Sequence, residues 1–110
     1  MIKKKNATIT ALGGYVPDKI LTNKMLESQV DTSDEWITSR TGIKERRILH
    51  DNNLATSDMA SFAIQDLLKQ SGVDPESIDC LILATSTPDY ILTPAATLVC
   101  EKAGLKNAWG

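Results

Sequence analysis

A short, unbroken apolar run between two helix patterns constrains the fold of this chain more than any other feature of its sequence. The run covers residues 80–84, with turn-forming residues on both sides. Apolar residues recur at helical spacing over residues 59–68 before it, and a second helix pattern covers residues 93–103 after it. A strand covered by helices on both faces needs such continuous apolar sequence. The chain is therefore predicted to be an α/β unit with a mostly parallel sheet flanked by helices.

Residues that favour helix termini mark the ends of both helices. The first helix is expected to begin at Thr56 and to end at Gly72. In the second, Thr93 is expected to be the N-cap and Pro94 the first helical residue, with Gly104 just past the end.

Four shorter elements are predicted as well. Residues 7–12 alternate in polarity and are rich in β-branched side chains, which is typical of a strand. Thr22 or Asn23 is expected to cap a short helix. Residues 45–49 are predicted to form a short strand, and Trp109 is expected to begin another.

The composition excludes several classes of protein. Of the 110 residues, 42% are hydrophobic and 24% are charged, which fits one soluble globular unit. The net charge of -2 argues against general nucleic-acid binding. No segment approaches the roughly eighteen apolar residues of a membrane span. The three lysines at residues 3–5 are not followed by the apolar core of a signal peptide.

The two cysteines and the single histidine are not expected to form a catalytic or metal site. Cys80 and Cys100 are too few for a disulfide framework, which favours a reducing, cytoplasmic location. Cys80 opens an apolar strand and Cys100 lies inside a helix, so both are expected to be inert thiols. His50 lies in a polar run and is expected to be a solvated loop residue.

A complete short helix can be delimited within residues 30–47. Thr32 and Glu35 have the spacing of a capping box, in which two side chains satisfy backbone donors at a helix start. Gly42 is expected to end the helix in the left-handed conformation.

Two side chains on this helix form the strongest candidate binding site. Trp36 and Arg40 are four residues apart and therefore project from one face. A flat indole beside a planar guanidinium could stack a heteroaromatic ring and bind a phosphate, and Lys44, Arg46 and Arg47 could neutralise further phosphate oxygens. Packing of Trp36 in the interior is the alternative, and spacing alone leaves both open.

Several ordered segments carry a resemblance to a known family. They are residues 13–17, 21–23, 31–37, 40–43, 45–46 and 84–90. Together they resemble the N-terminal signature of β-ketoacyl-acyl-carrier-protein synthase III, over nearly the whole chain. The resemblance implies the N-terminal part of a thiolase-like fold and a homodimeric enzyme. That enzyme would condense an acyl-coenzyme A primer with malonyl-acyl-carrier protein, with acyl-coenzyme A as a substrate and no further cofactor.

The same resemblance assigns roles to individual residues. It implies that Trp36, Arg40, Thr41 and Thr32 contact the adenine and phosphate end of coenzyme A at the mouth of a tunnel. It places Leu92 near the end of the primer pocket of the partner subunit in a dimer. The usual aromatic-Pro-Ser order is changed there to Leu-Thr-Pro, and a leucine leaves room for longer or branched primers.

The resemblance also implies that the catalytic residues lie outside this chain. The family uses a cysteine nucleophile with a histidine and an asparagine, and the nucleophile is expected shortly after Gly110. Residues 1–110 are therefore expected to be part of the N-terminal half of such an enzyme, truncated before the catalytic cysteine. Alone they are expected to be inactive.

Three other readings stay open. The chain could come from a related condensing enzyme of the thiolase superfamily, or it could be a non-catalytic module for coenzyme A binding or dimerisation. It could also be a generic nucleotide-binding α/β domain, although the missing glycine-rich phosphate loop counts against this.

Overall fold

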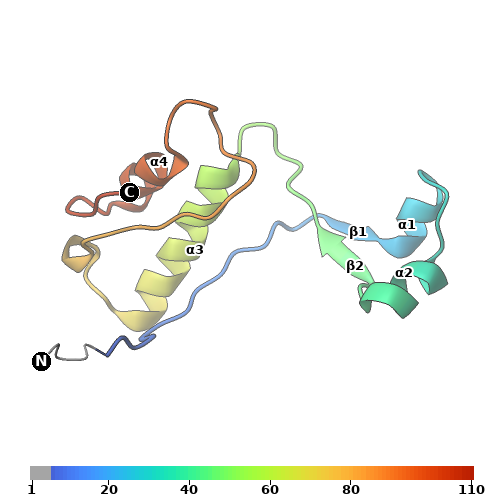
Figure 1. Cartoon of the computed structure of the whole chain (residues 1–110), viewed down its shortest axis with the longest axis horizontal. Helices are drawn as coiled ribbons and strands as arrows, with labels where there is room; N and C mark the ends of the chain where they lie inside the picture. Colours follow the sequence, from blue (N-terminus) through green and yellow to red (C-terminus); the bar gives the residue numbers. More distant parts are fainter. Residues whose placement is uncertain (1–5) are drawn as a thin grey trace, which may run out of the picture. The chain divides into compact units, whose positions relative to one another are not determined.

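The computed structural model describes residues 6–110, so the three lysines of the signal-peptide argument lie outside the described residues. The chain divides into two compact units (Figure 1). The smaller unit is Val16–Asn53, and the larger unit joins residues 6–15 to Leu54–Gly110. The elements, in chain order, are β1 (Ile20–Thr22), α1 (Asn23–Glu27), α2 (Asp34–Thr41), β2 (Glu45–Arg47), α3 (Thr56–Ser71), the 3-10 turn η1 (Pro75–Ser77) and α4 (Ala95–Ala103).

The smaller unit consists of a strand pair and two short helices. Strand β1 pairs antiparallel with β2, with Ile20 opposite Arg47 and Thr22 opposite Glu45. The predicted strand at residues 45–49 is confirmed over Glu45–Arg47, whereas β1 was missed because three residues carry no readable periodicity. Thr22 caps α1, as expected, and its Oγ1 accepts a hydrogen bond from the backbone N–H of Met25 at 3.3 Å.

In the larger unit, α3 and α4 pack against each other. The buried apolar residues contributed by α4 and the turn after it are Ala95, Val99, Cys100 and Leu105. The predicted stops of both helices are confirmed, since Gly72 and Gly104 adopt φ values of 68° and 75°. Only glycine enters this left-handed region without steric cost.

The start of α4 differs from the prediction by one residue. The helix begins at Ala95, Pro94 occupies the N-cap position with ψ of 116°, and no side chain caps the helix. Thr93 is therefore not the cap. The extended ψ of Pro94 keeps it outside the helix.

The predicted strand at residues 7–12 does not form, and the chain after it lies along α3 instead. A Cβ on Gly13 would approach the Cβ of Leu67 to 2.5 Å. The backbone N–H of Gly14 donates to Asp66 Oδ2 at 3.0 Å, and the rings of Tyr15 and Phe62 lie 4.9 Å apart between centroids. Gly13 thus permits a backbone approach that no side chain would allow.

The prediction of a buried central strand at residues 80–84 is wrong for the described part of the chain. Only Cys80 forms a bridge, which is parallel and pairs with Trp109. The N–H of Leu81 donates to the Trp109 carbonyl at 2.9 Å. Ile82 is 87% exposed. A run of this kind becomes a central strand only where strands lie on both of its edges, and among residues 6–110 one residue alone supplies a partner.

Replacing Gly13 by alanine should destabilise the larger unit. The added methyl group would overlap Leu67 on α3, and overpacking of this kind costs about 1–3 kcal/mol. Urea unfolding followed by circular dichroism measures the loss. Gly14→Ala is the matched control, because a Cβ there meets nothing within 4 Å; equal stability of the two variants would contradict the close approach.

An ion pair between α3 and α4 should make stability depend on pH. Lys102 Nζ lies 2.6 Å from Asp58 Oδ1. The hydrogen bond from Lys102, followed by that from the Ala55 N–H, lowers the pKa of Asp58 below its ordinary value. The unfolded chain therefore binds this proton more readily than the folded one. The stabilisation is complete above the unfolded pKa of about 4 and is lost as the pH falls through the lower folded value.

The variant Asp58→Asn should lose this acid dependence. Its free energy of unfolding should be lower than that of the wild type at neutral pH, and the two should converge as the pH falls below about 4. Glu101→Gln on α4 is the control, because the Glu101 side chain makes no hydrogen bond within residues 6–110. A pH-independent difference between Asp58→Asn and the wild type would count against the pair.

Candidate functional site

The candidate site lies on α2, and this helix begins one residue later than the predicted capping box requires. Ser33, not Thr32, is the N-cap, and its Oγ accepts from the N–H of Trp36 at 3.1 Å. Glu27 Oε1 accepts from the N–H of Asp34 at 2.7 Å. Two unpaired donors of the helix start are thus satisfied by a hydroxyl and a carboxylate, but the carboxylate comes from α1 and not from Glu35.

The helix stops where it was predicted to stop. Gly42 has φ of 71°, and its N–H donates to the Thr38 carbonyl at 2.9 Å. Thr41 contributes to the same end, because its Oγ1 donates to the Ile37 carbonyl at 2.8 Å and accepts from the Ile43 N–H at 3.1 Å. The hydroxyl of Thr41 is therefore engaged in ending the helix.

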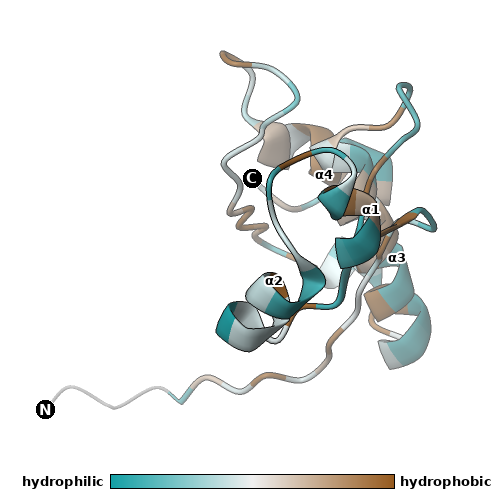
Figure 2. Cartoon of the chain, turned by 90° about the vertical axis from the view of Figure 1, so that its right-hand side faces the viewer, coloured by the Kyte–Doolittle hydropathy of each residue, from teal (hydrophilic) through white to brown (hydrophobic). Residues whose placement is uncertain are grey.

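Trp36 and Arg40 share one face of α2, as the spacing predicted. The guanidinium carbon of Arg40 lies 4.8 Å from the centroid of the indole. Trp36 is 53% exposed, and Arg40 is exposed. The indole is thus not sealed in the interior of the smaller unit. Figure 2 shows that α2 is mostly hydrophilic to neutral, as expected of a helix with one buried residue, Ile37.

A pocket adjoins the indole at the start of α2. It has a volume of about 360 Å³ and is lined by Asp31, Thr32, Ser33 and Trp36. Thr32 does not cap the helix, contrary to the prediction from the sequence, but it lines this pocket together with Trp36. Three of the predicted site residues are therefore connected: Thr32 and Trp36 through the pocket, and Arg40 through its contact with the ring.

A buried amide that sequence reasoning missed holds this helix in place. Asn23, in the first turn of α1, is 1% exposed. Its Nδ2 donates to Asp34 Oδ1 at 2.8 Å and to the Ile43 carbonyl at 2.7 Å, with Thr38 Oγ1 at 3.3 Å. These acceptors lie at the start, middle and end of the α2 segment, so one side chain fixes the whole helix.

The other end of the same amide binds a cation. Asn23 Oδ1 accepts from a terminal nitrogen of Arg46, NH2, at 2.9 Å. The orientation of the amide follows from chemistry, because a guanidinium can only donate, whereas a carboxylate or a carbonyl can only accept. The second terminal nitrogen of Arg46, NH1, is buried and has no hydrogen-bond partner in the described part of the chain.

This bond corrects the role that the sequence predicted for Arg46. The side chain is half-buried and serves the interior of the smaller unit, so it does not add to an exposed phosphate-binding face. Arg47 is exposed and donates to the Pro17 carbonyl at 3.1 Å, and Lys44 is exposed. The sequence offered one signal for the role of Asn23: two polar residues, Thr22 and Asn23, stand together at the start of α1. Only Thr22 is the cap of the helix.

The remaining candidate residues lie in the larger unit or in loops. Leu92 is 94% exposed, in the loop before α4. Cys100 is buried, Cys80 is half-buried, and both are free thiols. His50 is exposed in a loop. Among residues 6–110, no three metal-binding side chains cluster to form a metal site, and no helix combines the length and apolar composition of a membrane span.

Comparison with known proteins identifies relatives of the chain. No protein-family model matches it. A β-ketoacyl-[acyl-carrier-protein] synthase III of Bacteroides thetaiotaomicron is 51% identical over 108 residues, which are 98% of this chain and 32% of that protein. The crystal structure of the synthase III of Thermus thermophilus superposes with a TM-score of 0.84 at 46% identity, covering 94% of this chain and 32% of that one. The priming β-ketosynthase of the R1128 polyketide pathway superposes with a TM-score of 0.84 at 31% identity, covering 93% of this chain and 30% of that one.

The fold is that of the amino-terminal part of thiolase-like condensing enzymes. More particularly, the chain is homologous over nearly its whole length to the amino-terminal third of β-ketoacyl-acyl-carrier-protein synthase III. The chain spans about a third of the length of the curated relatives that it matches.

Replacing Asn23 by aspartate should strongly destabilise the smaller unit. The substitution keeps the shape but directs a carboxylate oxygen at Asp34 and at the Ile43 carbonyl, where a donor is needed. Each buried polar group left unpaired costs about 1–3 kcal/mol. Denaturant unfolding measures the loss, and Asn52→Asp, an exposed site in the same unit, is the control for the added charge. Equal stabilities would show that the Asn23 network is dispensable.

Proposed function

We propose that this chain is the part of a β-ketoacyl-acyl-carrier-protein synthase III that carries its coenzyme A entrance. The proposal rests on the exposed Trp36, which has Arg40 against its ring. Both lie on a helix within a segment homologous to that enzyme. The whole protein would condense an acyl-coenzyme A primer with malonyl-acyl-carrier protein and thereby begin fatty-acid synthesis.

The chemistry of the α2 face suits the nucleotide end of coenzyme A. An exposed indole offers a flat surface for an adenine ring, and the guanidinium of Arg40 offers paired donors to phosphate oxygens. The pocket lined by Thr32 and Trp36 adds a hydroxyl beside that surface. Thr41 stands at the end of the same helix, and we propose that it contacts the nucleotide of the coenzyme A substrate through the face that its own helix bonds leave free.

The bond-making steps belong to residues outside this chain. In the proposed reaction a cysteine thiolate takes the acyl group and releases coenzyme A. The malonyl group then loses carbon dioxide, and the resulting carbanion attacks the acyl thioester and expels the thiolate. Neither Cys80 nor Cys100 lies at the start of a helix, where a thiol is activated. We therefore propose that residues 1–110 alone bind and do not condense.

The proposed enzyme is a cytoplasmic homodimer that uses no cofactor beyond its acyl-coenzyme A substrate, and that binds neither nucleic acid nor membrane.

Leu92 would reach the primer pocket of the partner subunit, and its 94% exposure in this chain supports a role at such an interface. Its smaller side chain, compared with an aromatic residue, favours longer or branched primers. Comparing the rates with acetyl and branched primers in the full-length protein tests this.

The second candidate is a priming synthase of another carbon-chain pathway. The TM-score of 0.84 to a polyketide priming ketosynthase favours it, although the identity of 31% is lower than that to the synthase III structures. Both candidates share the coenzyme A entrance. The full-length protein separates them, because a fatty-acid synthase III accepts malonyl groups on the fatty-acid carrier protein. A non-catalytic binding module would condense nothing.

Replacing Trp36 by alanine in the full-length protein should raise the KM for acyl-coenzyme A. Stacking on an aromatic side chain is worth about 1–3 kcal/mol, which corresponds to roughly 5- to 150-fold. Steady-state kinetics with varied acyl-coenzyme A measures the change. Glu35→Gln, an exposed neighbour on α2, is the control. An unchanged KM for the alanine variant would remove the indole from the entrance.

A further inference from the structure

Asp89, in the loop between the apolar run and α4, is bonded to the first turn of α3. Its Oδ1 accepts from the backbone N–H of Ser57 at 2.9 Å, and its Oδ2 accepts a short hydrogen bond from Ser57 Oγ. Ser57 is the second residue of α3 and is fully buried. The carboxylate thus satisfies a helix-start donor, where the helix dipole also favours a negative charge.

A second bond joins the same two segments. Thr56, the first residue of α3, donates from its Oγ1 to the Thr87 carbonyl at 2.6 Å. Thr87 and Asp89 lie on either side of Pro88, so the loop is attached to α3 at two points around a residue whose φ is restricted. Two successive residues of α3 therefore fix the direction in which the loop leaves Asp89.

A lysine from α4 completes the network. Lys102 Nζ donates to Ser57 Oγ and to Asp58 Oδ1, both at 2.6 Å. Because the ammonium can only donate and the Asp89 carboxylate can only accept, the Ser57 hydroxyl must accept from Lys102 and donate to Asp89. The network thus connects the start of α3, the last turn of α4 and the loop.

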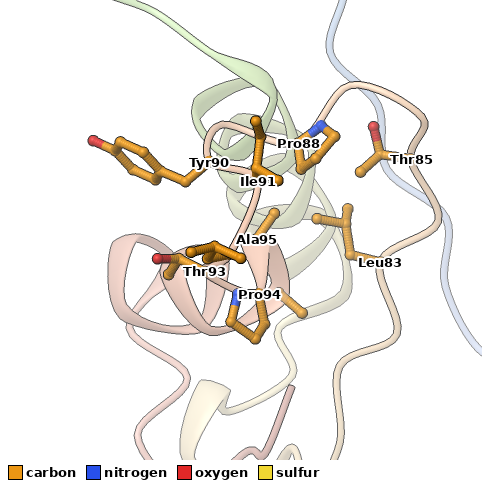
Figure 3. Close-up of a pocket in the computed structure, with 10 residues that line it drawn as sticks. Leu83, Thr85, Pro88, Tyr90, Ile91, Thr93, Pro94 and Ala95 are labelled. Carbon is orange, nitrogen blue, oxygen red and sulfur yellow. The ribbon is translucent and has the colours of Figure 1, made fainter.

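The loop fixed in this way forms one wall of a pocket. The pocket has a volume of about 350 Å³, and its lining includes Leu83, Pro88, Ile91, Leu92 and Ala95. Figure 3 shows Leu83, Pro88, Ile91 and Ala95 around the hollow, while the Tyr90 ring points away from Leu83 and Thr85. Residues 81–94 contain no helix or strand, and Ile91 is 97% exposed. No backbone ladder holds this wall, so its position depends on the bonds to α3.

We infer that Asp89 is a positioning residue that holds the loop carrying Leu92, so that it sets how far Leu92 reaches into the primer pocket of the partner subunit and hence which acyl chains the enzyme accepts. The inference rests on the proposed function, which gives Leu92 its place near the end of the primer. An acyl chain is apolar and is recognised by the fit of apolar walls, and one methylene of fit is worth about tenfold or more in selectivity. Releasing Asp89 lets the loop move, so Leu92 no longer has one fixed position and the preference for the primer that fits is lost.

The test uses the full-length protein with Asp89→Ala, Asp89→Asn and Thr56→Val. Asparagine keeps one acceptor for the Ser57 N–H but loses the acceptor for its hydroxyl, so its effect should be intermediate. Thr56→Val removes the second attachment with little change of shape. Glu101→Gln removes a charge from α4 without touching the network and is the control.

Two readouts are measured for each variant. The ratio of kcat/KM for the preferred acyl-coenzyme A over one with a chain two carbons longer should fall about tenfold in Asp89→Ala. Cleavage by chymotrypsin after Tyr90, which reports loop release directly, should become faster. The control should change neither quantity. If Asp89→Ala does not fold, Asp89→Asn and Thr56→Val should still show both effects in smaller measure.

The possible results distinguish a failure of this inference from a failure of the proposed function. Faster cleavage with an unchanged selectivity ratio would overturn the inference, because the network would then be structural only. Unchanged cleavage and an unchanged ratio would overturn it as well. If the wild-type protein condenses no acyl-coenzyme A at all, the proposed function itself fails. Active wild type with unaltered variants rejects this inference and leaves the proposed function standing.

Discussion

The candidate site depends on the buried amide of Asn23. The smaller unit, Val16–Asn53, has few apolar residues in its interior, and Ile37 is the buried one on α2. A helix of eight residues is too short to be stable by itself in water. Its position therefore relies on polar bonds that water cannot replace, and the Asn23 amide binds the start, the middle and the end of the α2 segment. Trp36 and Arg40 can be exposed because this amide, and not the indole, holds the helix.

The larger unit uses the same physical device at a different place. Ser57 is fully buried at the start of α3 and joins that helix to Asp89 in the loop and to Lys102 on α4. In both units a buried polar side chain satisfies groups from several segments at once. Such a network is worth more in the interior than in water, because every group in it would be costly to leave unpaired. Such bonds hold α2 in place in the smaller unit and the loop before α4 in the larger one.

The sequence predicted the local features of the fold well, because they depend on neighbouring residues. The stops at Gly42, Gly72 and Gly104 follow from the left-handed conformation that glycine favours. The cap at Thr22 and the shared face of Trp36 and Arg40 follow from spacing along a helix. The family resemblance also came from ordered motifs, and the comparisons confirmed it at about 50% identity.

What the sequence by itself determined is therefore where the helices end, which side chains share the α2 face and which family the chain resembles. The tertiary structure alone decided the rest. It made Ser33 the cap with Glu27 of α1 supplying the carboxylate, and it buried Arg46 against Asn23. It also left the apolar run at residues 80–84 with a single bridge to Trp109. Burial, strand pairing and hydrogen bonds between distant segments depend on which groups meet in space, and spacing along the chain does not encode that directly.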